Sequence, residues 1–394
     1  MRAAFFHDER FTLDPAGTYY SSGTLPYRSF QRYLKHFDRV IMVGRLGGAQ
    51  QSPMCTVASG PGVEFDCIPA GDLALPSFLA AVRRRAREVL ARVDCAVIRL
   101  PSLVGVLAAR EASVAGVPWM AEVVGDVFEA LWNHGSWRGK AAALPLYALN
   151  RYYVGRASSA IFVSTTLQRR YPPGGAWVAA SNVLIEAPRP EVLARRLARI
   201  ASTAPAAART IGLVGSYDVA YKGHETALRA LAGLRRRGKD VLLRCIGVGD
   251  PSRWLRRAAE LGVAAHVELG NARPHGEPVL RWMDELDALV VPSLTEGLPR
   301  CLVEGMSRAL PAVGSLTGGI PELLERPALH RPGDAAGMAR RLEALLWSPA
   351  TLEAQARRNW TLAGDYAAEV LEARRDGLIR RFKAGIAGGS ARAA

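Results

Sequence analysis

The sequence lacks the features that mark membrane-spanning, exported and zinc-binding proteins. No apolar run approaches the roughly 20 residues that a membrane-spanning helix needs. Near the amino terminus, Asp8 and Glu9 stand where a signal peptide would have its apolar segment. The five cysteines form no Cys-x-x-Cys pair, and the seven histidines are scattered along the chain. We therefore expect a protein of the reducing cytoplasm without a zinc site.

The length and composition indicate a globular protein with two domains. The chain has 394 residues, of which 49% are hydrophobic and 22% charged, and this length exceeds what one ordinary hydrophobic core supports. Segments with strand and helix patterns alternate to about residue 182, which is typical of a doubly wound α/β domain. Residues 186–208 are rich in alanine, arginine and proline. This shift in composition predicts a domain boundary there.

The net charge of +15 admits three explanations. The basic clusters are dispersed and lie in no recognised nucleic-acid-binding motif, which makes a nucleic-acid partner the least favoured explanation. Residues 83–85 and Arg87 lie in a segment whose apolar residues have helical spacing. Such a basic helix suits an anionic membrane surface, at about 1 kcal/mol per basic residue. The remaining explanation is a solvated, arginine-rich face.

The most informative stretch covers residues 288–325, where the pattern of strand, loop and helix occurs twice. Residues 288–292 form a short apolar run rich in β-branched residues, typical of a buried parallel strand. A helix is expected from about Pro299. A second strand, at residues 311–315, precedes the letters TGG and another helix start at Pro321. This arrangement places two helix N-termini and a glycine pair at the sheet edge where open α/β sheets bind ligands.

Two glutamates frame this edge. Glu296 lies in the loop after the first strand, and Glu304 lies in the helix that follows. Taken alone, Glu304 could form an ion pair with Arg300, worth about 0.3–0.5 kcal/mol, and Glu296 could stabilise a helix N-terminus. The spacing of the two acids does not by itself separate these structural roles from a role in binding.

The letters PSLTEGLPRCLVEGMS, followed by TGGIPELL, resemble the donor-binding core of family 4 glycosyltransferases, whose signature is a Glu-x7-Glu pair in this setting. The resemblance is strong over residues 211–325 and topological elsewhere. It implies the α/β GT-B fold, in which two Rossmann-like, doubly wound domains face a central cleft. It also implies that Glu296 faces the transferred sugar and that Glu304 accepts hydrogen bonds from the nucleotide ribose. The glycine pair matches the glycine-rich turn of the family.

Lys222 stands with Gly223 at the start of a predicted helix. A cation is disfavoured there by about 0.3–1 kcal/mol because of the aligned peptide dipoles, so we expect an anion to share the site. The resemblance implies that this anion is the donor diphosphate. Many family members carry a second cation, an arginine, at the position of Ser216. Arg244, Arg300 or an amino-terminal arginine could replace it.

The acceptor side of the predicted cleft departs from the family pattern. Many members carry a histidine close to the sugar, where this chain has valine near Val124. Asp126 is the nearest polar replacement and Glu122 the second, and either could orient a hydroxyl or accept the proton of the acceptor. The alternative for Asp126 is an N-cap of the following helix. Gly23 matches a family glycine that lets the backbone approach the donor phosphate or the acceptor, although turn geometry alone would also explain it.

The resemblance therefore predicts one site with two groups of residues. The catalytic candidates are Glu296 and Asp126. The donor-binding candidates are Lys222, Glu304, Gly215, Ser216, Gly297, Leu298, Gly318, Gly319 and Gly23. The family implies neither a metal nor a cofactor, and the lack of an Asp-x-Asp element agrees with a diphosphate neutralised by Lys222 and helix dipoles.

We expect five segments along the chain. The predicted order is an amino-terminal Rossmann-like acceptor-binding domain (1–185), a linker (186–208), a carboxy-terminal Rossmann-like nucleotide-sugar-binding domain (209–365), a helix that crosses back to the first domain (366–385) and a disordered tail (386–394).

The implied activity is that of a retaining, metal-independent glycosyltransferase. It would move a sugar from a nucleotide-diphosphate sugar to a hydroxyl of a glycan or lipid-linked glycan, in capsule, exopolysaccharide or lipopolysaccharide assembly, at the cytoplasmic face of the cell membrane. Two alternatives stay open: a GT-B epimerase or phosphorylase, and a catalytically inactive nucleotide-sugar-binding module. Ser216 and the absent histidine favour the inactive module.

Overall fold

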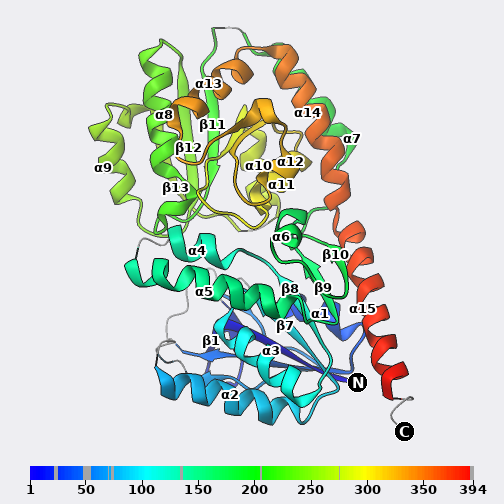
Figure 1. The fold of residues 1–394 in the computed structure, drawn as a ribbon. Coiled ribbons are helices and arrows are strands. Elements are labelled where there is room, and N and C mark those ends of the chain that lie inside the picture. Colours follow the sequence, from blue (N-terminus) through cyan, green and yellow to red (C-terminus); the bar gives the residue numbers. More distant parts are fainter. Residues whose placement is uncertain are drawn as a thin grey trace.

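The computed structural model describes residues 1–21, 25–47, 55–69, 71, 75–133, 136–204, 206–274 and 276–390. Within these ranges the chain forms two α/β domains, the amino-terminal one below the carboxy-terminal one in the view of Figure 1. Each domain is built on one largely parallel sheet covered by helices, as expected for alternating strands and helices. No helix of the described ranges is both long and apolar enough to cross a bilayer.

The amino-terminal sheet is organised around β1 (Arg2–Leu13), which pairs in parallel with β3 (Arg39–Leu46) and β7 (Cys95–Leu100). Its residues Phe5 and Phe6 point to opposite faces and are both buried, because helices cover both faces of the sheet. The other strands are β2 (Tyr19–Ser21), β4 (Thr56–Val57), β5 (Val63–Phe65), β6 (Ile68–Pro69), β8 (Trp119–Val123), β9 (Ser159–Phe162) and β10 (Ala176–Ala179).

Serine caps begin three of the helices of this domain. The hydroxyl oxygens of Ser102, Ser136 and Ser164 each accept a hydrogen bond from the backbone N–H three residues later, which satisfies a donor that the first helical turn leaves free. The helices are α1 (Tyr27–Leu34), α2 (Pro76–Leu90), α3 (Leu103–Ala115), α4 (Val127–Asn133), α5 (Trp137–Val154) and α6 (Thr165–Arg170).

The carboxy-terminal sheet is parallel, with the order β13-β12-β11-β14-β15-β16. Its strands are β11 (Arg209–Val214), β12 (Val241–Gly247), β13 (Val267–Asn271), β14 (Ala288–Val291), β15 (Ala312–Ser315) and β16 (Leu329–His330). Its helices are α8 (His224–Arg236), α9 (Ser252–Glu260), α10 (Glu277–Asp284), α11 (Arg300–Ser307), α12 (Ile320–Leu323) and α13 (Ala335–Leu346). Because β11 and β14 are neighbours, the loops at their carboxyl ends lie side by side.

The last two helices connect the domains along one side of the molecule (Figure 1). α14 (Pro349–Ala363) packs on the carboxy-terminal domain, and α15 (Ala368–Ser390) continues down against the amino-terminal sheet. Arg375 of α15 is buried and donates hydrogen bonds to the backbone carbonyls of Ala180 and Ser181. Asp376 pairs with His36 at 2.8 Å. One continuous cluster of buried apolar residues accordingly includes residues of both sheets and of α15.

The first strand of the amino-terminal sheet continues into an antiparallel pair. β1 extends to Leu13, and β2 turns back antiparallel to it. Phe11, which is fully buried, holds this extension on the core, and the side chains of Ser21 and Glu9 form a buried hydrogen bond of 2.7 Å. The predicted site residue Gly23 lies outside the described residues.

Two predicted boundaries also change. The region predicted as a linker contains α7 (Pro190–Ser202), whose buried Arg196 donates hydrogen bonds to the carbonyls of Met283 and Leu286. The segment predicted to be disordered from residue 386 begins inside α15, which runs to Ser390. Residues 391–394 lie outside the part of the chain that the structure describes.

Two glycines at the ends of α8 give a matched stability test. Gly223 (φ 80°) precedes the helix and Gly238 (φ 73°) follows it, so both are left-handed. A Cβ on Gly223 would lie 2.1 Å from the carbonyl oxygen of Pro292, whereas one on Gly238 would meet nothing within 4 Å. We expect Gly238→Ala to cost about 1 kcal/mol of stability and Gly223→Ala roughly 1–3 kcal/mol more. Urea unfolding followed by circular dichroism measures both, and equal losses would contradict the close approach.

Candidate active site

The backbone between β11 and α8 places Lys222 beside the loop that follows β14. Lys222 ends a short 3-10 turn (Ala220–Lys222), and Gly223 then turns the chain into α8 against the carbonyl of Pro292. Gly215, at the end of β11, leaves room for the lysine, because a Cβ there would lie 3.0 Å from Lys222 Cβ and Cγ. The two predicted donor-site residues Gly215 and Lys222 are therefore in contact.

Lys222 and Glu296 form a direct ion pair in which Nζ and Oε1 are 2.6 Å apart. The same carboxylate oxygen accepts a hydrogen bond of 2.9 Å from the Ser293 hydroxyl. Burial alone would lower the pKa of Lys222, but the charge of Glu296, the hydrogen bond that it accepts from Lys222 and the nearby Cys301 and Tyr221 together outweigh burial and raise the pKa above its usual value. Glu296 therefore supplies the anion that we expected beside Lys222 at the start of α8. The position of Lys222 at a helix start does not by itself require a bound phosphate.

Glu304 projects from the second turn of α11 close to this pair. Among the described residues, no hydrogen bond or ion pair engages its carboxylate, so the alternative of a close pair with Arg300 is wrong. Burial raises the pKa of Glu304, and the positive charge of Arg300 offsets this effect only in part. Burial also raises the pKa of the nearby Cys301 thiol to about 12, and the charges of Lys222, Glu296 and Glu304 all act on that thiol. The three predicted residues therefore share one neighbourhood.

The predicted glycines bring the loops after β14 and β15 into backbone contact. Gly318 is left-handed (φ 52°), and a Cβ there would lie 1.8 Å from the carbonyl oxygen of Glu296. The Gly319 N–H donates to the Gly297 carbonyl at 2.7 Å. A Cβ on Gly297 would in turn lie 2.4 Å from the Val124 carbonyl oxygen at the end of β8. Only glycine permits these approaches, which fix the loop of Glu296 between both domains.

Polar contacts between the domains surround the same loops. The carboxylate of Glu322 accepts hydrogen bonds from the N–H groups of Thr165 (3.0 Å) and Thr166 (2.5 Å) at the start of α6. The Thr295 hydroxyl donates to Glu129 of α4 at 3.1 Å. A carboxylate of one domain thus caps a helix of the other. This contact holds the loops of the two domains close together at the site.

Asp126 does not have the catalytic environment that the sequence suggested. Its carboxylate is buried, accepts a hydrogen bond from the Glu129 N–H at 2.9 Å and pairs with Arg170. The capping alternative is therefore the one found. Glu122, the second candidate, accepts hydrogen bonds from Tyr33 and Asn182.

The charge state of Glu122 also opposes a role as a proton acceptor. Burial would raise the pKa of this carboxyl, but the charges of Arg99, Arg32 and Arg375 outweigh burial and hold the pKa below its usual range. A strongly stabilised carboxylate is a weak general base near neutral pH.

The position of Ser216 offers no cation, as the sequence predicted. The Ser216 hydroxyl accepts a hydrogen bond from the Asp218 N–H at 3.3 Å. Arg244, one candidate to compensate, is paired with Glu268 (2.9 Å) and Glu285 (2.6 Å) on the sheet and is excluded. Arg300 has no such partner among the described residues and faces a cavity between the domains.

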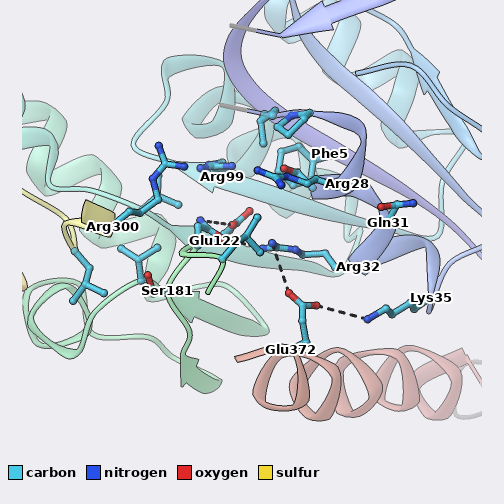
Figure 2. A pocket seen from close by; sticks show the side chains of 18 residues that line it. Phe5, Arg28, Gln31, Arg32, Lys35, Arg99, Glu122, Ser181, Arg300 and Glu372 are labelled. Atoms are coloured by element: carbon cyan, nitrogen blue, oxygen red, sulfur yellow. Dashed lines mark hydrogen bonds and ion pairs between the residues drawn. The ribbon is translucent and has the colours of Figure 1, made fainter. Parts of the chain in front are cut away.

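This cavity has a volume of about 420 Å³ and adjoins the loop of Glu296 through Leu298. Figure 2 shows side chains from α1, β7, β8, α11 and α15 around it. Its charged lining residues are Arg28, Arg32, Lys35, Arg99, Arg300, Glu122 and Glu372. These cations of α1 were not predicted as site residues, although the spacing of Arg28, Arg32 and Lys35 by four and three residues places them on one helix face.

Comparison with known proteins supports one assignment for this fold. Residues 208–348 match the family model described as glycosyl transferases group 1. The chain is 27% identical over 391 residues to protein CapJ of Staphylococcus aureus, which covers 97% of this chain and 96% of CapJ. It is 36% identical over 128 residues to the amylovoran biosynthesis glycosyltransferase AmsK of Erwinia amylovora, or 30% of this chain and 31% of AmsK.

The solved structures agree with this match. HepE of Anabaena, crystallised in complex with UDP, aligns with a TM-score of 0.63 at 15% identity, over 97% of this chain and 100% of HepE. A likeness at this identity concerns the fold, which is the two-domain GT-B architecture. The chain therefore has the GT-B fold and is a glycosyltransferase, and its residues 208–348 match the model of the group 1 glycosyl transferases.

Proposed function

We propose that this protein is a retaining, metal-independent glycosyltransferase of polysaccharide assembly. Its donor would be a nucleotide-diphosphate sugar, and its acceptor a hydroxyl of a glycan or lipid-linked glycan of a capsule, exopolysaccharide or lipopolysaccharide. The observation that carries the proposal is the cluster of Lys222, Glu296 and Glu304 at the loops that join the domains. AmsK acts in amylovoran biosynthesis and HepE binds UDP, which agrees with this donor and this product class.

The proposed reaction exchanges one bond at the anomeric carbon of the sugar. The bond from this carbon to the diphosphate oxygen breaks, and its electron pair leaves with the diphosphate. A bond to the acceptor oxygen forms on the same face, and the acceptor proton passes to a phosphate oxygen of the leaving group. Lys222 and the N-terminal turn of α8 would stabilise the charge that builds on the diphosphate. In this proposal no bound metal and no cofactor take part.

The Lys222–Glu296 pair would open when the donor binds. The diphosphate is a stronger partner for Lys222 than one carboxylate, and the sugar hydroxyls can donate hydrogen bonds to Glu296. Glu304, whose carboxylate has no partner among the described residues, would accept hydrogen bonds from the ribose. Before the donor arrives, the pair neutralises two partly buried charges, which would otherwise destabilise the empty site.

We expect Glu296→Ala to lower kcat by about 10²–10³, because the sugar loses its main partner while positive charge develops. The affinity for the nucleoside diphosphate should be unchanged or slightly higher, since Lys222 then has no competing carboxylate. The measurement is nucleotide release from UDP-, GDP- and ADP-sugars, after thermal shifts have identified the base, with and without a membrane extract as acceptor.

Glu285→Gln, which removes a carboxylate paired with Arg244 away from the site, is the matched control and should retain full activity. Retained activity of Glu296→Ala would contradict the assignment and favour an inactive binding module. Nucleotide release by the wild type that is equally fast without any acceptor would favour an epimerase.

The unpartnered carboxyl of Glu304 predicts a pH-dependent stability difference. Its pKa is raised in the folded state, so it stabilises the fold only below its ordinary pKa of about 4.3, and this contribution is lost as the pH rises through the folded pKa. Glu304→Gln should therefore gain stability over the wild type as the pH rises from about 4 toward neutrality. Urea unfolding across this range measures the difference. A difference that is independent of pH, as expected for the exposed control Glu186→Gln, would contradict the buried charge.

The proposed contact with an anionic membrane involves a different helix from the predicted one. The arginines of α2 are ion-paired in the structure, because Arg83 and Arg87 share Glu111, at 2.8 and 2.6 Å, and Arg85 pairs with Asp66 at 3.0 Å. A solvated, ion-paired face explains this cluster better than lipid binding does.

The helix α5 has the properties that α2 lacks. Trp137, Leu144 and Tyr152 lie along one face, with 75%, 65% and 53% of their surface exposed. No acidic residue occurs between Glu129 and Glu186, whereas six basic residues do. Exposed aromatic and aliphatic residues beside basic residues suit the headgroup region of an anionic bilayer. We include this surface of α5 in the proposal as the membrane contact.

The double variant Trp137→Ser/Leu144→Ser should lose most of the binding of the protein to vesicles of anionic phospholipid, because it removes the apolar part of the α5 surface. Sedimentation with vesicles at low and high salt measures the bound fraction. Leu255→Ser, which alters an exposed leucine of α9 in the other domain, should bind as the wild type does. Equal binding of both variants, or no binding by the wild type at either salt concentration, would remove the membrane contact from the proposal.

A further inference from the structure

The cavity between the domains carries a charge that the donor site does not explain. Five cationic side chains and two carboxylates line it, a formal excess of three positive charges. Arg32 and Lys35 lie 3.7 and 3.9 Å from the shared carboxylate of Glu372 (Figure 2). Two cations that share one carboxylate leave one positive charge there, and Arg28, Arg99 and Arg300 against Glu122 contribute the other two.

None of these three arginines has a hydrogen bond or a carboxylate within 4 Å among the residues that the structure describes. Arg99 is only 8% exposed, and its Nε is buried without a partner. Glu122 faces Arg99 electrostatically, but the oxygens of Glu122 already accept from Tyr33 and Asn182. A buried guanidinium without partners is unfavourable unless an anion completes it.

The three arginines place the missing anion near the loop of Glu296, the residue proposed to face the transferred sugar. In Figure 2 the guanidinium groups of Arg300, Arg99 and Arg28 follow one another along one side of the cavity. Arg300 begins α11, and Leu298 of the same loop lines the cavity wall two residues after Glu296. An anion held by these arginines would lie on the side of the Glu296 loop that faces the amino-terminal domain, whereas Lys222 lies on the side that faces the carboxy-terminal domain.

We infer that this cavity binds a diphosphate group that belongs to the acceptor. Planar guanidinium groups bind phosphate oxygens through paired hydrogen bonds. An excess of three positive charges matches a diphosphate ester better than a neutral sugar or a single carboxylate. The inference rests on the proposed function, because it takes the donor diphosphate to be bound at Lys222, and it narrows the acceptor to a diphosphate-linked glycan.

The test uses inorganic pyrophosphate and farnesyl diphosphate as probes of the cavity. Isothermal titration calorimetry would measure their binding to the full-length protein that is already saturated with the nucleoside diphosphate of highest affinity, in buffer without divalent cations. D-Glucuronate serves as the carboxylate probe. Two variants, Arg99→Gln and the exposed Arg28→Gln, remove one guanidinium each, and Arg84→Gln of α2 is the control with the same loss of charge.

We expect both diphosphates to bind the nucleotide-saturated protein, and we expect Arg99→Gln and Arg28→Gln each to weaken this binding at least tenfold. The control should bind as the wild type does, and the affinity for the nucleoside diphosphate should be the same in all four proteins. Arg28→Gln keeps the test valid if the buried Arg99→Gln fails to fold.

Several results would overturn the inference. Pyrophosphate that binds only when the nucleotide is absent, with an affinity that neither variant changes, would belong to the donor site. Glucuronate that binds the cavity in place of the diphosphates would assign it to an acidic sugar. Failure of every nucleoside diphosphate to bind would instead contradict the proposed function, and the two variants would still report on the cavity directly.

Discussion

The contact between Lys222 and Glu296 is the interaction on which the proposed donor site depends. Each residue lies at the carboxyl end of a different strand of one parallel sheet, and the neighbouring strands β11 and β14 bring the two loops together. Their closeness depends on backbone approaches that only glycine allows, at Gly223 on Pro292 and at Gly318 on the carbonyl of Glu296. The fold thus builds a compact pair of opposite charges. The diphosphate of a donor can replace Glu296 as the partner of Lys222, and the hydroxyl groups of the donor can replace Lys222 as the partner of Glu296.

The loop of Glu296 also lies where the two domains meet. Gly297 packs on the end of β8, and Glu322 caps α6, so the amino-terminal domain contacts the loops that hold the donor residues. The cavity lies against this junction, and α15 closes one side of it through Glu372. Because the loop of Glu296 contributes to both the donor site and the cavity wall, a movement of one domain would change both together.

Local patterns predicted those parts of the structure that depend on neighbours in sequence. The strands at residues 288–292 and 311–315, the helix start at Pro299 and the grouping of Lys222, Glu296 and Glu304 are found as expected. Features that depend on contacts between residues far apart in the sequence were not predicted. Buried hydrogen bonds of Arg196 hold a helix in the predicted linker, and the cationic cavity assembles residues from five elements whose charges look ordinary in the sequence. The local sequence allowed two roles for Asp126, a catalytic carboxylate or a helix cap. In the structure Asp126 caps the helix and also pairs with Arg170.

A crystal structure with the nucleoside diphosphate that binds most tightly, together with its sugar, tests the central claim most directly. We predict that Lys222 Nζ contacts a phosphate oxygen, that Glu296 contacts a sugar hydroxyl, and that the 2.6 Å contact between the two side chains is lost. A nucleotide bound elsewhere, with the Lys222–Glu296 pair intact, would contradict it.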